Sequence, residues 1–146
     1  MESHISCDKE ALDFDFIYQY LHNHAYWCLG IPEDVVKKSI QHSLCFGVYL
    51  ESKQIGFARV ISDYATFAYL GDVFIDPACR GNGYSKQLMD AVTQHPDLQG
   101  LRRFSLNTAD AHSLYEQYGF TSLNAPDRGM EIVDPDIYRN QTKSDF

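Results

Sequence analysis

The sequence predicts a single mixed α/β domain spanning residues 1–146, with helices flanking one central sheet. The chain has 146 residues, enough for one domain with a real core. Apolar residues make up 45% and charged residues 22%, the usual composition of a globular protein. Segments with helical periodicity and segments with strand character follow in the order β-α-α-β-β-β-α-β-α-β, which defines a mixed α/β class.

The first half of the chain is predicted to hold two helices and three long strands. Apolar residues at helical spacing predict a helix from about Asp13 to Asn23. A proline followed by acidic residues predicts a second helix that begins at Pro32. Residues 45–50 and 54–63 are predicted strands around a short turn. A third strand covers 66–75 and ends at an Asp-Pro pair, because proline lacks the N–H donor of a continuing ladder.

The second half is predicted to alternate helices with strands. We expect a helix from Gly83 to about Thr93 and a strand at 101–108. A short helix from Asp110 to Tyr118 should follow, closed by a glycine. The segment MEIV, residues 130–133, is predicted to be a last strand before an Asp-Pro pair.

Charge and hydropathy exclude several classes of protein. The formal charge is −8 with a pI near 5.0, which argues against nucleic acid as a partner. No apolar run approaches the roughly 18 residues of a membrane span, and the N-terminus is too polar for a signal peptide. We therefore expect a cytoplasmic protein without a membrane partner. Dispersed cysteines and histidines predict neither disulfides nor a metal site.

The stretch RGNGYS, residues 80–85, follows a predicted strand and opens a predicted helix. The first N–H groups of a helix lack internal partners and carry the positive end of its dipole. Glycines allow a ligand to approach the backbone closely, and phosphate is the usual ligand of such a loop. Arg80 can add charge-assisted hydrogen bonds. A strand followed by Gly-x-Gly can also be only a tight turn.

Two common phosphate motifs do not fit this stretch. Dinucleotide binding requires a third glycine where Lys86 stands, and the P-loop pattern is absent. The stretch instead resembles the acetyl-CoA motif [RQ]-x-x-G-x-[GA] of the GCN5-related N-acetyltransferase (GNAT) family, with Ser85 in place of the final small residue. Residues 111–120, AHSLYEQYGF, resemble the family's second block, A-x-x-L-Y-x-x-x-G-F. Two blocks in this order make the resemblance specific, and the element order extends it over most of the chain.

The resemblance implies the fold and the donor site. The sheet would be mostly antiparallel, and the strand at 66–75 would splay away from the strand at 101–108. Main-chain groups of Val73 and Ile75 would bond the pantetheine arm of acetyl-CoA, and a donor near Val73 would polarise the thioester carbonyl. Thr108 would contact the coenzyme or cap the next helix. One loop and the start of its helix would bind the pyrophosphate: Arg80, Gly81, Asn82, Gly83, Tyr84, Ser85 and Lys86.

The resemblance also implies the catalytic groups. Tyr115 stands where the family places the acid that protonates the departing thiolate, although it could instead only pack its helix. A thiolate leaving group has a pKa of about 8.5, so a weakly acidic phenol can support its departure. The strand face where relatives often carry a glutamate should present Tyr69 and Gly71 here, and no carboxylate. Asp72 is the candidate general base if a bulge turns it to that face. Otherwise a water chain, Tyr69 or an amine that is already neutral must suffice.

The resemblance places the acceptor between the N-terminal helices and the splayed strands. Tyr26 and Trp27 are candidate lining residues that could stack on a cation or pack the core instead. Tyr69 and Arg59 are further candidates. Arg59 and Asp63 could form an ion pair, clamp a substrate carboxylate, or do neither.

The sequence therefore predicts an acetyl-CoA-dependent N-acetyltransferase that acts on a small-molecule amine by direct attack in a ternary complex. One alternative is an acetyl-CoA-binding sensor or interaction module, which the missing carboxylate favours. Another is a protein or peptide acetyltransferase, against which the bulky aromatic residues near Tyr26 argue. A homodimer, common in the family, stays open, and the predicted C-terminal strand could support it.

Overall fold

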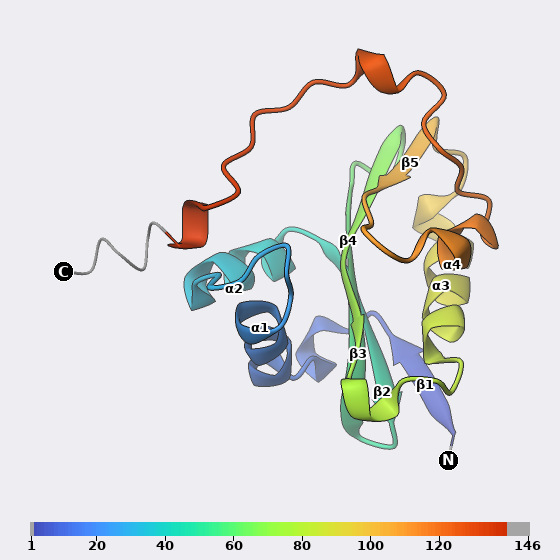
Figure 1. The fold of residues 1–146 in the computed structure, drawn as a ribbon. Helices are drawn as coiled ribbons and strands as arrows, with labels where there is room; N and C mark the ends of the chain where they lie inside the picture. The colour runs from blue at the N-terminus through green and yellow to red at the C-terminus, as the bar shows by residue number, and fades with distance from the viewer. Residues whose placement is uncertain (1, 140–146) are drawn as a thin grey trace.

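The computed structural model describes residues 2–139 and shows one five-stranded sheet with helices on both faces (Figure 1). The strands lie side by side in chain order, and only the β4–β5 pair is parallel. Helices α1 and α2 cover one face, and α3 and α4 cover the other (Figure 1). The strands are β1 (Ser3–Ser6), β2 (Leu44–Leu50), β3 (Lys53–Ser62), β4 (Phe67–Ile75) and β5 (Arg103–Leu106). The helices are α1 (Phe14–Asn23), α2 (Glu33–Gln41), α3 (Tyr84–Gln94) and α4 (His112–Glu116), with 3-10 turns at Lys9–Ala11, Pro77–Cys79, Pro96–Leu98 and Pro126–Arg128. The predicted fold class is confirmed.

The helices begin close to where their capping residues predict. The Asp13 carboxylate accepts a hydrogen bond from the Phe16 amide, 3.1 Å, which satisfies one free donor at the start of α1. Pro32 is the N-cap of α2 and not its first helical residue. Gly83, with a φ of 83°, precedes the first turn of α3.

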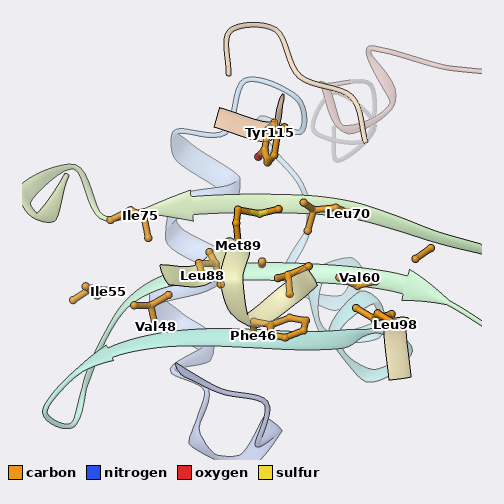
Figure 2. Packing of buried hydrophobic residues seen from close by; sticks show 13 residues of the cluster. Phe46, Val48, Ile55, Val60, Leu70, Ile75, Leu88, Met89, Leu98 and Tyr115 are labelled. Atoms are coloured by element: carbon orange, nitrogen blue, oxygen red, sulfur yellow. The ribbon is translucent and has the colours of Figure 1, made fainter. Parts of the chain in front are cut away.

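Two apolar clusters hold the layers together, one on each face of the sheet. Leu88 and Met89 of α3 pack on the face that carries Phe46 and Leu70, as Figure 2 shows. The other cluster joins the first two helices to the opposite face. Successive side chains of a strand point to opposite faces of the sheet, so the same strands contribute residues to both clusters.

β4 changes both its neighbours and its pleat along its length. It pairs with β5 only from Phe67 to Leu70 and then continues alone on that side, which opens the splay that the family resemblance implies. Opposite β3, the register shifts between Phe57 and Arg59, because β4 carries one extra residue there. Asp72 lies at this bulge with a φ of 55°.

The expected last strand at residues 130–133 is wrong. This segment has no regular secondary structure, and Met130 and Ile132 are 98% and 106% exposed. The described part of the chain after α4 arcs away from β5 and reaches α2, and Tyr138 packs against the cluster under the first two helices (Figure 1). Strand-forming side chains alone do not make a strand, because a ladder needs a neighbour to bond. None of the helices within residues 2–139 is long and apolar enough to cross a bilayer.

Candidate active site

The glycine loop, residues 80–85, has the geometry that the sequence predicts for an anion site. Gly81 and Gly83 have φ values of 84° and 83°, a left-handed conformation that favours glycine. A Cβ at either position would meet nothing within 4 Å, so the space beside the loop is open. Within the described chain, no side chain caps the start of α3. The loop therefore presents uncapped helix donors to a ligand.

A hollow of about 200 Å³ lies against this loop. Its wall includes Ser85 and Lys86 of α3 and Leu114 of α4. The predicted cofactor-binding residues Ile75, Arg80, Gly81, Gly83, Tyr84, Ser85 and Lys86 all line it. The structure thus brings most of the predicted cofactor-binding residues of the loop to one concavity, although Asn82 does not line it.

Arg80 and Asn82 hold the loop in shape. The Arg80 Nε donates to the carbonyl of Ile75, 3.1 Å, and its Nη2 donates to the Tyr20 hydroxyl, 2.9 Å. The Asn82 side chain donates to the carbonyl of Cys79, 3.1 Å. Arg80 therefore ties the end of β4 to α1. The predicted contact of Arg80 with phosphate would be made in addition to these two hydrogen bonds.

The free edge of β4 presents main-chain groups to the splay. The Asp76 amide donates to the carbonyl of Ile55 on β3, 2.7 Å. Alternation along an antiparallel strand then directs the main-chain groups of Ile75 and Val73 toward the opposite edge. The Arg80 contact to the Ile75 carbonyl agrees with this direction. These are the two residues expected to pair with a pantetheine arm.

Tyr115 is buried on α4, 8% exposed, and its ring packs edge to face against Phe120. Figure 2 shows the ring above β4, near Met89 and Leu70. Burial raises the pKa of the Tyr115 hydroxyl, and electrostatic interactions with Asp110 and Tyr26 add to the effect. The hydroxyl therefore keeps its proton at neutral pH and is able to donate it.

Three neighbouring polar residues take distinct positions around this helix. Thr108 Oγ1 accepts a hydrogen bond from the amide of Ala111, 3.0 Å, and Ala111 and not Thr108 is the N-cap of α4. The Tyr118 hydroxyl donates to the Lys86 carbonyl, 2.8 Å, and so fastens α4 to α3. The Asn107 side chain donates to the Tyr69 hydroxyl across the strands, 3.1 Å. Sequence reasoning did not include Asn107 in the site. The two-residue alternation along the strand could have identified it, because it places Asn107 on the same face of the sheet as Tyr69.

The bulge in β4 turns Asp72 to the face covered by α1 and α2. The Arg59 Nε donates to Asp72 Oδ2, 2.9 Å, and the Trp27 Nε1 donates to Oδ1, 2.8 Å. The Arg59 and Asp72 side chains are 18% and 11% exposed. Arg59 also donates from Nη1 to the Ser43 hydroxyl, 3.0 Å. Arg59 and Trp27 together engage both oxygens of the Asp72 carboxylate.

Arg59 therefore pairs with Asp72, whereas Asp63 has a separate role. The Asp63 carboxylate accepts hydrogen bonds from the amides of Ala65, 2.9 Å, and Thr66, 2.7 Å, and from the Thr66 hydroxyl. These bonds hold the pKa of Asp63 well below its usual range, with the Thr66 hydroxyl contributing most. Asp63 shapes the turn between β3 and β4.

Tyr26 and Trp27 lie at the surface, so the alternative that they pack the core is wrong. Their rings meet edge to face, with centroids 5.0 Å apart. The Tyr26 hydroxyl accepts a hydrogen bond from the Ala109 amide, 3.3 Å, beyond the end of β5. Together with the Trp27 bond to Asp72, this contact ties the turn after α1 to both splayed strands. No group of side chains within residues 2–139 is arranged to hold a metal ion.

Comparisons with known proteins agree with this geometry. The family model described as an acetyltransferase (GNAT) domain matches residues 41–122. A crystal structure of a GNAT-family acetyltransferase from Xanthomonas campestris pv. campestris shares 55% identity, with a TM-score of 0.92 over 94% of this chain and 97% of that one. An acetyltransferase of Gibberella zeae is 31% identical over 133 residues, covering 76% of this chain and 74% of that protein.

The chain belongs to the GCN5-related N-acetyltransferase family. It is an acetyltransferase, and the family uses acetyl-CoA as its co-substrate. The fold is shared more widely. Glucosamine-6-phosphate N-acetyltransferase from Arabidopsis thaliana has 12% identity and a TM-score of 0.63 over 92% of this chain and 98% of that one. The ribosomal-protein-S18-alanine N-acetyltransferase of Escherichia coli has 21% identity and a TM-score of 0.67 over 84% and 80%.

Proposed function

We propose that this enzyme transfers the acetyl group of acetyl-CoA to the amine of a small molecule, by direct attack in a ternary complex. The observation that carries the proposal is the position of Asp72. The bulge turns this carboxylate to the face covered by α1 and α2, the proposed acceptor side, where it accepts a hydrogen bond from Trp27. Arg59 balances the charge of Asp72, but the carboxylate can still accept a hydrogen bond from an ammonium group, and the acidic chain as a whole favours the approach of a cation.

On the donor side, the main chain does most of the binding. The amides of the glycine loop and the start of α3 bind pyrophosphate, and Gly81 and Gly83 leave room for it. Lys86 and Ser85 line the same hollow and add polar side chains. Val73 and Ile75 orient the pantetheine arm along the open edge of β4, and the Val73 region polarises the thioester carbonyl. Thr108 contributes by holding the start of α4.

Tyr115 donates a proton or a hydrogen bond to the leaving group. Its buried hydroxyl keeps its proton at neutral pH, because burial raises its pKa. When the thioester breaks, the hydroxyl hydrogen-bonds or protonates the departing sulfur, whose own pKa is about 8.5. The packing against Phe120 fixes the ring.

Asp72 orients the acceptor nitrogen, and its predicted role as the general base is replaced in this proposal. Its two oxygens already accept hydrogen bonds from Arg59 and Trp27, and Arg59 is its ion-pair partner. Each carboxylate oxygen has a second lone pair, which can accept a hydrogen bond from the acceptor nitrogen. We assign removal of the amine proton to water at this site, before the amine attacks.

The turn after α1 favours a small acceptor. Its two aromatic residues bond to the β5–α4 connection and to β4, so they bridge the mouth of the splay. A peptide substrate needs an open groove for an extended chain, whereas Tyr26 and Trp27 present bulky rings at that place. Tyr69, bonded to Asn107, adds a further ring on the same face.

Release of free thiol from acetyl-CoA tests the proposal. The purified protein is incubated with acetyl-CoA and two sets of acceptors, small primary amines and peptides with free N-termini. We expect turnover with one or more small amines and none with the peptides. Turnover with peptides alone would overturn the acceptor class. Tight CoA binding without turnover on either set would support the sensor, the alternative that the ion-paired state of Asp72 favours.

A further inference from the structure

Three apolar side chains of the sheet stay partly uncovered beside the proposed acceptor site. Ile61 of β3 and Phe67 of β4 are 45% and 40% exposed, and Tyr69 of β4 is half-buried. Neither apolar cluster of the described chain includes any of the three. Single exposed apolar residues are common on protein surfaces, whereas a contiguous group is a feature of binding sites. We call Ile61, Phe67 and Tyr69 the open face.

The alternation of the strands places the open face on the side of α1 and α2. Val60 and Leu70 belong to the cluster that packs on α3, so their neighbours Ile61 and Tyr69 point to the opposite side of the sheet. Ile61 and Tyr69 are also direct partners in the antiparallel register of β3 and β4. Helices α1 and α2 lie beside the later part of β4, and the start of this strand extends beyond them (Figure 1).

Gly71 connects the open face to the polar end of the acceptor site. It lies between Tyr69 and Asp72 in the chain and is the register partner of Arg59. Apart from its chain neighbours, a Cβ at Gly71 would meet only the Tyr69 ring within 4 Å among the described residues, with the nearest atom at 3.5 Å. The strand surface between this ring and the Arg59–Asp72 ion pair is therefore not filled by another packed side chain.

Hydrogen bonds hold two aromatic rings at this surface. The Tyr69 hydroxyl accepts a hydrogen bond from the Asn107 side chain, 3.1 Å. The Trp27 indole donates to the Asp72 carboxylate, 2.8 Å. Rings that are already fixed offer apolar contact to a ligand and lose little further freedom when it binds. This surface therefore combines an apolar floor with one carboxylate that can still accept a hydrogen bond.

We propose that the acceptor is a primary amine with an apolar body, of which an arylalkylamine is the best fit. Its nitrogen hydrogen-bonds to Asp72, and its body lies over Gly71 against Tyr69, Ile61 and Phe67. The inference rests on the proposed acetyl transfer to a small amine and names the chemical class of that amine. Removal of the open face from water stabilises the bound amine, a contribution that a polar amine of similar length does not gain.

Rates with two amines of contrasting body test the acceptor class. Phenethylamine carries an aromatic ring at the position where ethanolamine carries a hydroxyl group. We expect kcat/KM to be at least about tenfold higher for phenethylamine, because its ring is buried on the open face. An equal or higher kcat/KM for ethanolamine would overturn the apolar body and would leave acetyl transfer to small amines standing.

Ile61→Ser tests whether the open face makes the contact. We expect KM for phenethylamine to rise by about fivefold, and KM for ethanolamine and the affinity for CoA to change little. Phe67→Ser should act in the same direction and keeps the test available if Ile61→Ser does not fold. Ile132→Ser is the matched control, because Ile132 is fully exposed after α4, and it should leave both KM values unchanged. Unchanged KM values in both folded variants, with an altered oligomeric state in sedimentation, would assign the open face to a protein interface and contradict the proposal.

Calorimetric titration of the CoA-loaded protein with phenethylamine separates this inference from the proposed chemistry. We expect binding that Ile61→Ser weakens and Ile132→Ser does not. Such binding without turnover of any amine would support the open face as a ligand site and count against acetyl transfer to small amines. Absence of both binding and turnover with phenethylamine would show that the apolar amine is the wrong ligand class.

Discussion

The glycine loop is built from neighbours in the sequence, whereas the acceptor side joins Trp27, Arg59 and Asp72 from three separate elements. The loop works through backbone conformation: two glycines with positive φ and an uncapped helix. The acceptor side works through side chains, in one ion pair and one indole bond. The donor half can thus be specified by a short motif, and the acceptor half can change with single substitutions far apart in the chain.

Tyr115→Phe has the largest expected effect, because the proposed mechanism makes Tyr115 the proton donor for the leaving group. We expect kcat to fall by about a hundredfold and the affinity for acetyl-CoA to stay nearly unchanged, since only a proton donor is lost. Steady-state kinetics with a fixed amine measures both. Because burial raises the pKa of Tyr115, the acid function is present below that pKa and is lost as pH rises through it, above about pH 10.

Tyr118→Phe is the matched control for this substitution. It removes a phenol from the same region, one that donates to the Lys86 carbonyl. It should cost about 1 kcal/mol of stability and leave kcat within a few fold. Equal losses of kcat in the two variants would assign Tyr115 to packing.

Gly83→Ala tests the claim that the donor half depends on the backbone. The Cβ would enter the open space beside the loop, so we expect the affinity for CoA to fall by about tenfold. Calorimetric titration measures it. Gly100→Ala is the control, with a similar φ of 72° and the same open surroundings away from the site. Both variants should lose about 1–2 kcal/mol of stability, and only the first should lose affinity.

Asp72→Asn tests the claim that the acceptor half depends on charge. We expect KM for the amine to rise by about tenfold and kcat to change little, since the orienting charge is lost. Stability should fall by about 2 kcal/mol, because Arg59 loses its charged partner in a mostly buried place. Trp27→Phe is the control and should move KM less. If the acidic limb of the pH–rate profile disappears in Asp72→Asn, Asp72 is the general base and the orienting role is wrong.

Asp63→Ala should change neither half of the site and has the smallest expected effect. The hydrogen bonds in its turn depress the pKa of Asp63 in the folded protein. Its contribution to stability is therefore present above the unfolded pKa of about 4 and is lost as pH falls through the lower folded value. Urea unfolding at neutral and acidic pH should show a shallower acid loss in the variant. Any change in KM for the amine would return Asp63 to the acceptor site.

The contrast between the two halves also explains what the sequence could predict. The loop, its helix and the Tyr115 block were predictable because their contacts are local. The orientation of Asp72 was not, because it follows from a bulge that breaks the two-residue alternation of β4. Asp tolerates positive φ better than most residues, which is a weak signal for such a bulge. Residues 130–133 show the converse: they have strand-forming side chains, but no strand within residues 2–139 pairs with them.

Initial rates with both substrates varied test the central claim most directly, because direct attack requires the donor and acceptor halves to be filled together. We predict intersecting double-reciprocal lines and no acetylated protein in mass spectra of enzyme incubated with acetyl-CoA alone. Cys79 lines the donor hollow and is the obvious alternative carrier. Parallel lines, with an acetyl group on Cys79 that an added amine removes, would contradict direct transfer.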